Sequence, residues 1–90
     1  MSDILTKGAK GEAVRELQTR LAQLGFTVTA DGHFGDITHN LVIAVQAIFG
    51  YDIDGVAGPA TQKLIQKQLE LGWNLERARQ HGYATNQAQV

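Results

Sequence analysis

The sequence predicts an all-α fold, a small three-helix bundle with two Asp-Gly turn loops and a short fourth helix near the C-terminal end. Apolar residues recur at helical spacing in three segments. The stretch DGHFGDIT at residues 31–38 also returns as DGVAGPAT at residues 54–61. A fainter copy of the same unit, G-x-x-G-x-x-(V/T)-x-x-L, runs from Gly8 to Leu17. Three such units predict three helices wrapped round one core.

The first predicted helix covers residues 12–24 and stops at Gly25, which suits a left-handed terminating position. Its apolar residues fall at i, i+3, i+7 and i+10, so they share one face of the helix. They are Val14, Leu17, Leu21 and Leu24.

The second and third predicted helices each follow an Asp-Gly loop. The second covers residues 36–49 and begins at Asp36, whose negative charge suits the positive end of a helix. Its expected inner face consists of Ile37, Leu41, Ala44, Val45 and Ile48. The third covers residues 59–71 and begins at Pro59, because the first helical position does not need an N–H. Its expected inner face consists of Leu64, Ile65 and Leu69.

The end of the chain is less regular. The segment NLERARQHG predicts a short fourth helix with Asn74 as its cap and Gly82 as its stop. The residues after it have too little apolar content to be held against a core. We therefore expect a three-helix domain over residues 1–72, followed by a short helix and a flexible tail or linker stub over residues 73–90.

The repeated loop is first a folding device. Asp-Gly pairs favour tight turns, so the first glycine of each loop, Gly32 and Gly55, is expected at positive φ. The second glycine, Gly35 or Gly58, permits another positive φ or a close approach of backbone. The threonine three residues later can hydrogen-bond the loop backbone where the helix begins.

Composition limits the possible partners. Apolar residues make up 43% of the chain, charged residues 19%, and the net charge is −1, as in ordinary soluble globular proteins. The basic residues are spread along the chain, which argues against a helix-turn-helix DNA reader. The longest apolar run, residues 41–45, is far below the roughly 18 residues of a membrane helix. We expect neither a nucleic-acid nor a membrane partner.

No pattern of residues predicts catalysis or a cofactor. The chain has no cysteine, and its three histidines show no zinc-binding spacing. Two sets only faintly resemble metal ligands: Asp31, His33 and Asp36, and the pair Asp52 and Asp54. Turn formation explains these acidic residues better, because the further oxygen ligands of a calcium loop are absent. We expect no catalytic residue, no metal and no cofactor.

Three stretches carry a family resemblance: LTKGAKGEAVRELQTRLAQLGF at residues 5–26, DGHFGDIT, and DGVAGPATQKL at residues 54–64. Their order and spacing resemble the peptidoglycan-binding domain attached to bacterial and phage cell-wall lytic enzymes. The resemblance covers about two thirds of the chain and implies a three-helix bundle. It also implies non-catalytic binding of peptidoglycan, which would target an attached or associated lytic enzyme or phage particle to the wall.

Two departures from that family pattern keep a second hypothesis open. The family has an aromatic residue before the glutamine of its second helix, where this chain has Val45 before Gln46, and a tryptophan where this chain has Gln62. The residues that could replace the lost volume are Phe49, Tyr51 and Trp73. A domain that lost these aromatics could be a regulatory or protein-interaction domain that keeps the bundle without binding wall.

The candidate binding site is a groove between the starts of the second and third helices. Backbone N–H groups at helix starts are free donors in a favourable dipole, which suits the carboxylates of stem peptides. One lip is expected to hold Asp31, His33 and Asn40, and the other Asp54, Gln62 and Lys63. Each of these could instead be solvated surface. Trp73 could stack on a sugar, although a lid over the core is the better interpretation.

The expected partner is peptidoglycan, both glycan and stem peptide, and the chain is expected to be a monomer. The resemblance places its action at the cell wall or in the periplasm. The N-terminal residues MSDILTKGAKGE contain no basic run followed by an apolar segment. We therefore expect the chain to be made in the cytoplasm without a signal peptide and released by another route.

Overall fold

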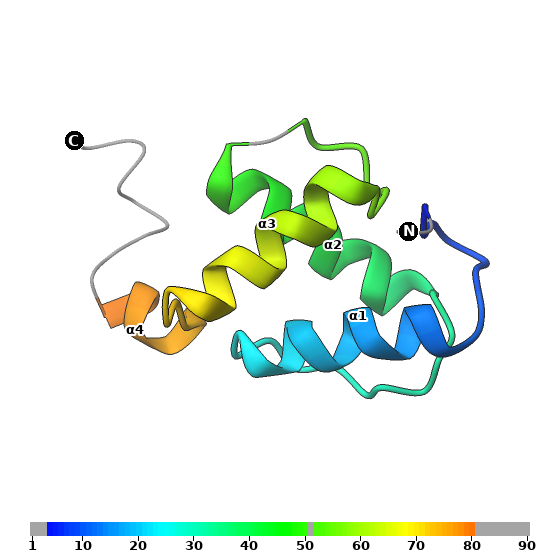
Figure 1. The fold of residues 1–90 in the computed structure, drawn as a ribbon, viewed down its shortest axis with the longest axis horizontal. Helices are drawn as coiled ribbons and strands as arrows, with labels where there is room; N and C mark the ends of the chain where they lie inside the picture. Colours follow the sequence, from blue (N-terminus) through cyan, green and yellow to red (C-terminus); the bar gives the residue numbers. More distant parts are fainter. Residues whose placement is uncertain (1–3, 51, 81–90) are drawn as a thin grey trace.

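The computed structural model describes residues 4–50 and 52–80, with side chains up to residue 78. Four helices follow one another: α1 (Glu12–Gln23), α2 (Asp36–Phe49), α3 (Pro59–Glu70) and α4 (Leu75–Gln80). Figure 1 shows α3 crossing the bundle and α4 lying beyond its end. The predicted all-α three-helix bundle with a short fourth helix is confirmed. None of the described helices is long and apolar enough to cross a membrane.

The helices begin and end close to where the glycine and proline residues predict. Pro59 is the first residue of α3, as predicted. Gly25 has a φ of 107° and Gly50 a φ of 77°, so both adopt the left-handed conformation expected after a helix. Leu24 and Leu71 are the C-terminal caps of α1 and α3, so each of these helices is one residue shorter than predicted.

The predicted inner face of α1 is confirmed. All four of its stripe residues are buried in the hydrophobic core, which they share with parts of α2, α3 and both loops. The core residues of α3 are Leu64 and Ile65, and Leu69 packs against them while partly exposed. Apolar periodicity alone predicts the buried faces of these two helices, because their buried positions are mainly apolar.

The predicted inner face of α2 is partly wrong. Ile37 is 67% exposed, and Leu41 packs against the core only while half-buried. The buried residues are Thr38, Val42, Val45 and Gln46. The hydroxyl of Thr38 accepts a buried hydrogen bond from α1, which fixes Thr38 inward. Ile37 precedes it by about 100° of helical rotation and therefore points outward.

The first glycines of the two loops behave as predicted, since Gly32 has a φ of 79° and Gly55 a φ of 72°. The expectation for the second glycines is wrong. Gly35 and Gly58 have extended backbones at negative φ, and a Cβ on either would meet no atom within 4 Å. Both are the N-caps of the following helices, as Gly11 is for α1.

The N-terminal segment joins the two loops. Leu5 and Ala57 exchange backbone hydrogen bonds of 3.0 and 2.7 Å, which ties the segment to the second loop. Gly8 donates to the carbonyl of Phe34, whose own N–H donates to Ala9, which ties the segment to the first loop. Phe34 is 2% exposed, so the prediction that it packs the first loop inward is confirmed.

The chain after α3 packs back onto the core. Leu75 is buried, and its N–H donates to the carbonyl of Leu24 at 2.6 Å. Trp73 lies with its ring centroid 6.3 Å from that of Phe26 and 5.2 Å from that of Phe49, which supports its interpretation as a lid.

The predicted cap of the fourth helix is confirmed, since Asn74 accepts a hydrogen bond from the N–H of Glu76. The predictions for Tyr51, Gly82 and the tail concern residues outside the part of the chain that the structure describes.

Candidate functional site

A buried glutamine on α1 holds the first loop. The side chain of Gln18 is 1% exposed. Its Nε2 lies 3.1 Å from Oδ1 of Asp31, 2.9 Å from the carbonyl of His33 and 2.9 Å from the hydroxyl of Thr38. Its Oε1 accepts a 2.9 Å hydrogen bond from the N–H of Gly32. One side chain therefore fixes the aspartate, the glycine and the threonine of the repeat.

A second glutamine holds the second loop in the same way. Gln46 of α2 is 2% exposed. Its Nε2 donates toward Oδ1 of Asp54, the carbonyl of Val56 and the hydroxyl of Thr61, at 2.9, 3.1 and 3.2 Å. Its Oε1 accepts from the N–H of Gly55 at 3.0 Å. The two threonines thus contact a glutamine, which corrects the expectation that they hydrogen-bond loop backbone.

The loop aspartates are held as carboxylates. Oδ1 of Asp31 accepts a 2.9 Å hydrogen bond from the N–H of His33, and Oδ1 of Asp54 accepts one of the same length from Val56. These backbone donors, followed by the glutamine amides, lower the pKa of both aspartates below the ordinary value. Both carboxylates are therefore ionised at neutral pH.

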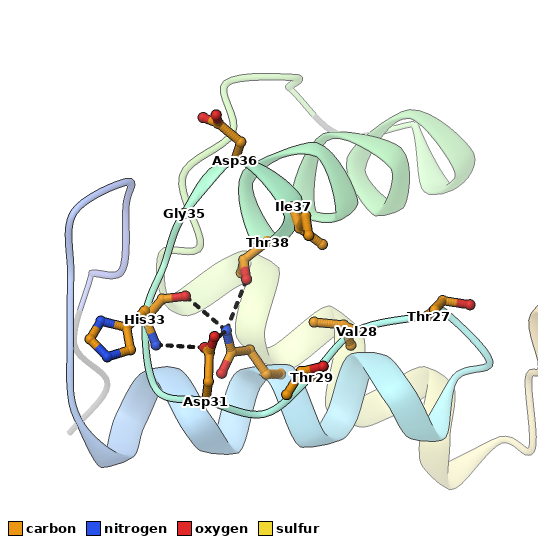
Figure 2. A pocket seen from close by; sticks show the side chains of 10 residues that line it. Thr27, Val28, Thr29, Asp31, His33, Gly35, Asp36, Ile37 and Thr38 are labelled. Atoms are coloured by element: carbon orange, nitrogen blue, oxygen red, sulfur yellow. Dashed lines mark hydrogen bonds between the residues drawn. The ribbon is translucent and has the colours of Figure 1, made fainter.

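A hollow of about 620 Å³, the first hollow, opens beside the first loop, and such concave spaces are where small ligands bind. Its lining consists of Gln18, Thr27, Val28, Thr29, Asp31, His33, Gly35, Asp36, Ile37 and Thr38. Figure 2 shows the segment 27–29 on one side and the start of α2 on the other. Val28 and Ile37 give it an apolar side, while Thr38 and Asp31 give it a polar end.

The structure brings only part of the expected site together. Asp31 and His33 line the first hollow, but Asn40, Gln62 and Lys63 do not. Asp54 lines a separate hollow of about 260 Å³, the second hollow, with Gln46, Thr61 and the start of α3. Asp31 and Asp54, one from each expected lip, therefore line two separate hollows.

The two positions at which this chain lacks the family's aromatic residues have structural roles of their own. Nε2 of Gln62 donates to the carbonyl of Ala57 at 2.7 Å, which closes the second loop at the position where the family has tryptophan. Val45, at the position of the other missing aromatic, is completely buried in the core.

The segment 27–29 and Ile37 were missed as site residues. Thr27 and Val28 are β-branched residues just before a turn, which is a pattern for extended chain that could have drawn attention to them. Ile37 was missed because it was assigned to the core.

The charges around the first loop are arranged unevenly. Asp36 forms a 2.5 Å ion pair with Lys7, and this pair lowers the pKa of Asp36. Lys10 and Arg15 line a neighbouring hollow that shares Asp31 and His33 with the first.

Within residues 4–50 and 52–80, no group of three or more acidic or histidine side chains is placed to hold a metal ion.

The sequence model of the peptidoglycan-binding domain family matches residues 10–70, which include both glutamines and both loops. The chain belongs to this family.

Relatives and solved structures agree. The N-acetylmuramoyl-L-alanine amidase CwlL of Bacillus licheniformis is 43% identical over 65 residues, which are 69% of this chain and 18% of the amidase. The crystal structure of the SleB N-terminal domain has a TM-score of 0.71 and 40% identity, and covers 74% of this chain and 93% of its own. For the Burkholderia AP3 phage endolysin the TM-score is 0.68 and the identity 35%, over 70% of this chain and 24% of the endolysin.

The chain spans only 13% to 28% of the length of curated relatives that carry amidase or carboxypeptidase names. The match therefore concerns the binding domain, and the activities of those whole proteins are not transferred to this chain.

Proposed function

We propose that this chain binds peptidoglycan through the first hollow without cleaving it, and that it brings an attached or associated lytic enzyme or phage particle to the wall. The observation that carries the proposal is the first hollow itself, which lies entirely within the residues that match the family. Its lining combines apolar side chains with hydroxyl and carboxylate groups, which suits the methyl and amide groups of a stem peptide. Tethering of this kind raises the effective concentration of whatever is attached.

Binding without hydrolysis fits the chemistry around the first hollow. Hydrolysis would require a nucleophile beside a base, or a metal-bound water. The threonine hydroxyl at the polar end, on Thr38, is buried and accepts a hydrogen bond from Gln18. The Oδ1 atom of Asp31 is engaged in its turn. These groups serve the loop, which supports a binding role.

Sedimentation with purified cell-wall sacculi tests the proposal. The protein should leave the supernatant while the turbidity of the suspension stays constant. The variant Ile37→Asn should bind at least about fivefold more weakly, because it removes an apolar contact of the order of 1 kcal/mol from the hollow. Ile37 is 67% exposed, so the fold should tolerate the change.

Leu71→Asn is the matched control. Leu71 is 68% exposed and does not line the first hollow, so this variant should bind like the wild type. A protein that stays in the supernatant with sacculi of several stem-peptide types would favour the regulatory alternative. Clearing of the suspension would instead indicate an enzyme. We also propose that the chain acts as a monomer, which sedimentation velocity would check.

A further inference from the structure

The first hollow contains one carboxylate whose charge has no ion-pair partner in the described chain. Its lining includes two acidic residues, Asp31 and Asp36, and neither lysine nor arginine. Asp36 is paired with Lys7, and Figure 2 shows its carboxylate pointing away from the rest of the lining. The hydrogen bonds that the side chain of Asp31 accepts from Gln18 and from the N–H of His33 both end on Oδ1. Oδ2 of this exposed carboxylate is therefore available to a ligand.

Peptidoglycan offers several kinds of chemical group to such a site, and of these the free carboxylates of its stem peptides would be repelled by the ionised Asp31. Its sugars are neutral and bind best against an aromatic face, but the only ring in the lining is the imidazole of His33, which Figure 2 shows pointing outward. Its stem peptides offer alanine methyl groups, which match the apolar side formed by Val28 and Ile37. Where a stem peptide is not cross-linked, its diamino acid also carries a free primary ammonium group, which is the complement of an ionised carboxylate.

We propose that Asp31 determines specificity for stem peptides that carry a free ammonium group, which it binds through Oδ2 at the edge of the first hollow. This inference rests on the proposed wall-binding function and names the part of the wall that is recognised. The stem that donates its amine to a cross-link has lost that ammonium group to an amide bond, so the domain would favour regions of the wall with few cross-links.

The second loop supplies an internal control for this role. Asp54 has the same kind of turn as Asp31, an equivalent glutamine partner in Gln46, and a pKa lowered by the same kinds of hydrogen bond. However, the second hollow is smaller, at about 260 Å³, and has Pro59 and Ala60 where the first hollow has Asp36 and Ile37. Asp54 therefore shares the structural role of Asp31 without lining the first hollow.

The test compares Asp31→Asn and Asp54→Asn on two preparations of sacculi. Asparagine keeps an Oδ1 acceptor for the turn and for the glutamine while removing the charge. One preparation is native, and the other is treated with acetic anhydride to convert its free amines to amides. Acetylation should weaken wild-type binding about fivefold, the size expected for one partly exposed charged contact. Asp31→Asn should bind native sacculi about fivefold more weakly and be insensitive to acetylation.

Asp54→Asn should keep both the native affinity and the sensitivity to acetylation. If wild-type protein binds acetylated sacculi as tightly as native sacculi, the inference is overturned while the proposed function stands, and this measurement needs no variant. The inference also fails if Asp31→Asn remains sensitive to acetylation, or if Asp54→Asn loses as much binding. Absence of binding to any sacculi would refute the proposed function itself.

Discussion

Replacement of Gln18 by alanine should remove a large part of the stability of the domain. The change leaves two buried groups without their partner, the N–H of Gly32 and the hydroxyl of Thr38. A buried polar group that loses its hydrogen bond costs about 1–3 kcal/mol. The lost packing of the side chain adds to this, so we expect a loss of about 3–5 kcal/mol in the free energy of unfolding.

This loss can be compared with the total free energy of unfolding of the domain. A chain of 90 residues has a free energy of unfolding of about 5–13 kcal/mol. For a domain of this size 1 kcal/mol lowers the melting temperature by about 4–8 °C, so Gln18→Ala should melt at least about 12 °C below the wild type. Thermal unfolding, monitored by circular dichroism, measures this difference in melting temperature.

Gln23→Ala is the matched control, because Gln23 is an exposed glutamine on the same helix. It should change the free energy of unfolding by less than about 0.5 kcal/mol. If Gln18→Ala melts within two or three degrees of the control, a scale set by the same conversion, the glutamine does not hold the loop and the reasoning is refuted.

Three further outcomes are expected. Val42 is completely buried, so Val42→Ala should cost about 2 kcal/mol of stability, measured by urea unfolding. Because the folded state lowers the pKa of Asp31 and Asp54, their contribution to stability is present above about pH 4 and is lost as the pH falls through the folded pKa values. The melting temperature should therefore fall in acid, and less so in the double asparagine variant. Gly55→Ala would combine positive φ with a Cβ placed 2.3 Å from Cε1 of His39, so it should destabilise by about 2 kcal/mol or more and lower the yield of folded protein.

The helices were predictable because glycine and proline mark their ends and apolar residues mark their inner faces. The error on α2 has a physical cause. Thr38 and Gln46 occupy buried positions that periodicity assigns to apolar residues, and they do so because each has hydrogen-bond partners inside the bundle. A sequence pattern that counts only apolar residues therefore rotates the helix by about one position.

The candidate site was less predictable than the fold. The Asp-Gly loops drew attention to Asp31 and His33, which do line the first hollow. The opposite side of the hollow comes from segment 27–29, and its place beside the start of α2 depends on how the chain returns along α1 (Figure 2). The spacing of residues within the loop sequence does not indicate where segment 27–29 lies. The expectation of one shared groove assumed that similar loop sequences share one site, whereas each loop is held by a glutamine from a different helix.

The two copies of the loop differ in the connection that precedes them. Residues 24–30 separate the end of α1 from Asp31, and residues 50–53 separate the end of α2 from Asp54, so the first connection has seven residues and the second four. The extra length coincides with the presence of segment 27–29, which lines the larger hollow, while both loops keep the same glutamine, aspartate, glycine and threonine contacts. Repetition thus supplies the fold with two similar turns and helix starts. The larger hollow lies where one copy departs from the repeat, because the longer connection contributes segment 27–29 to its lining.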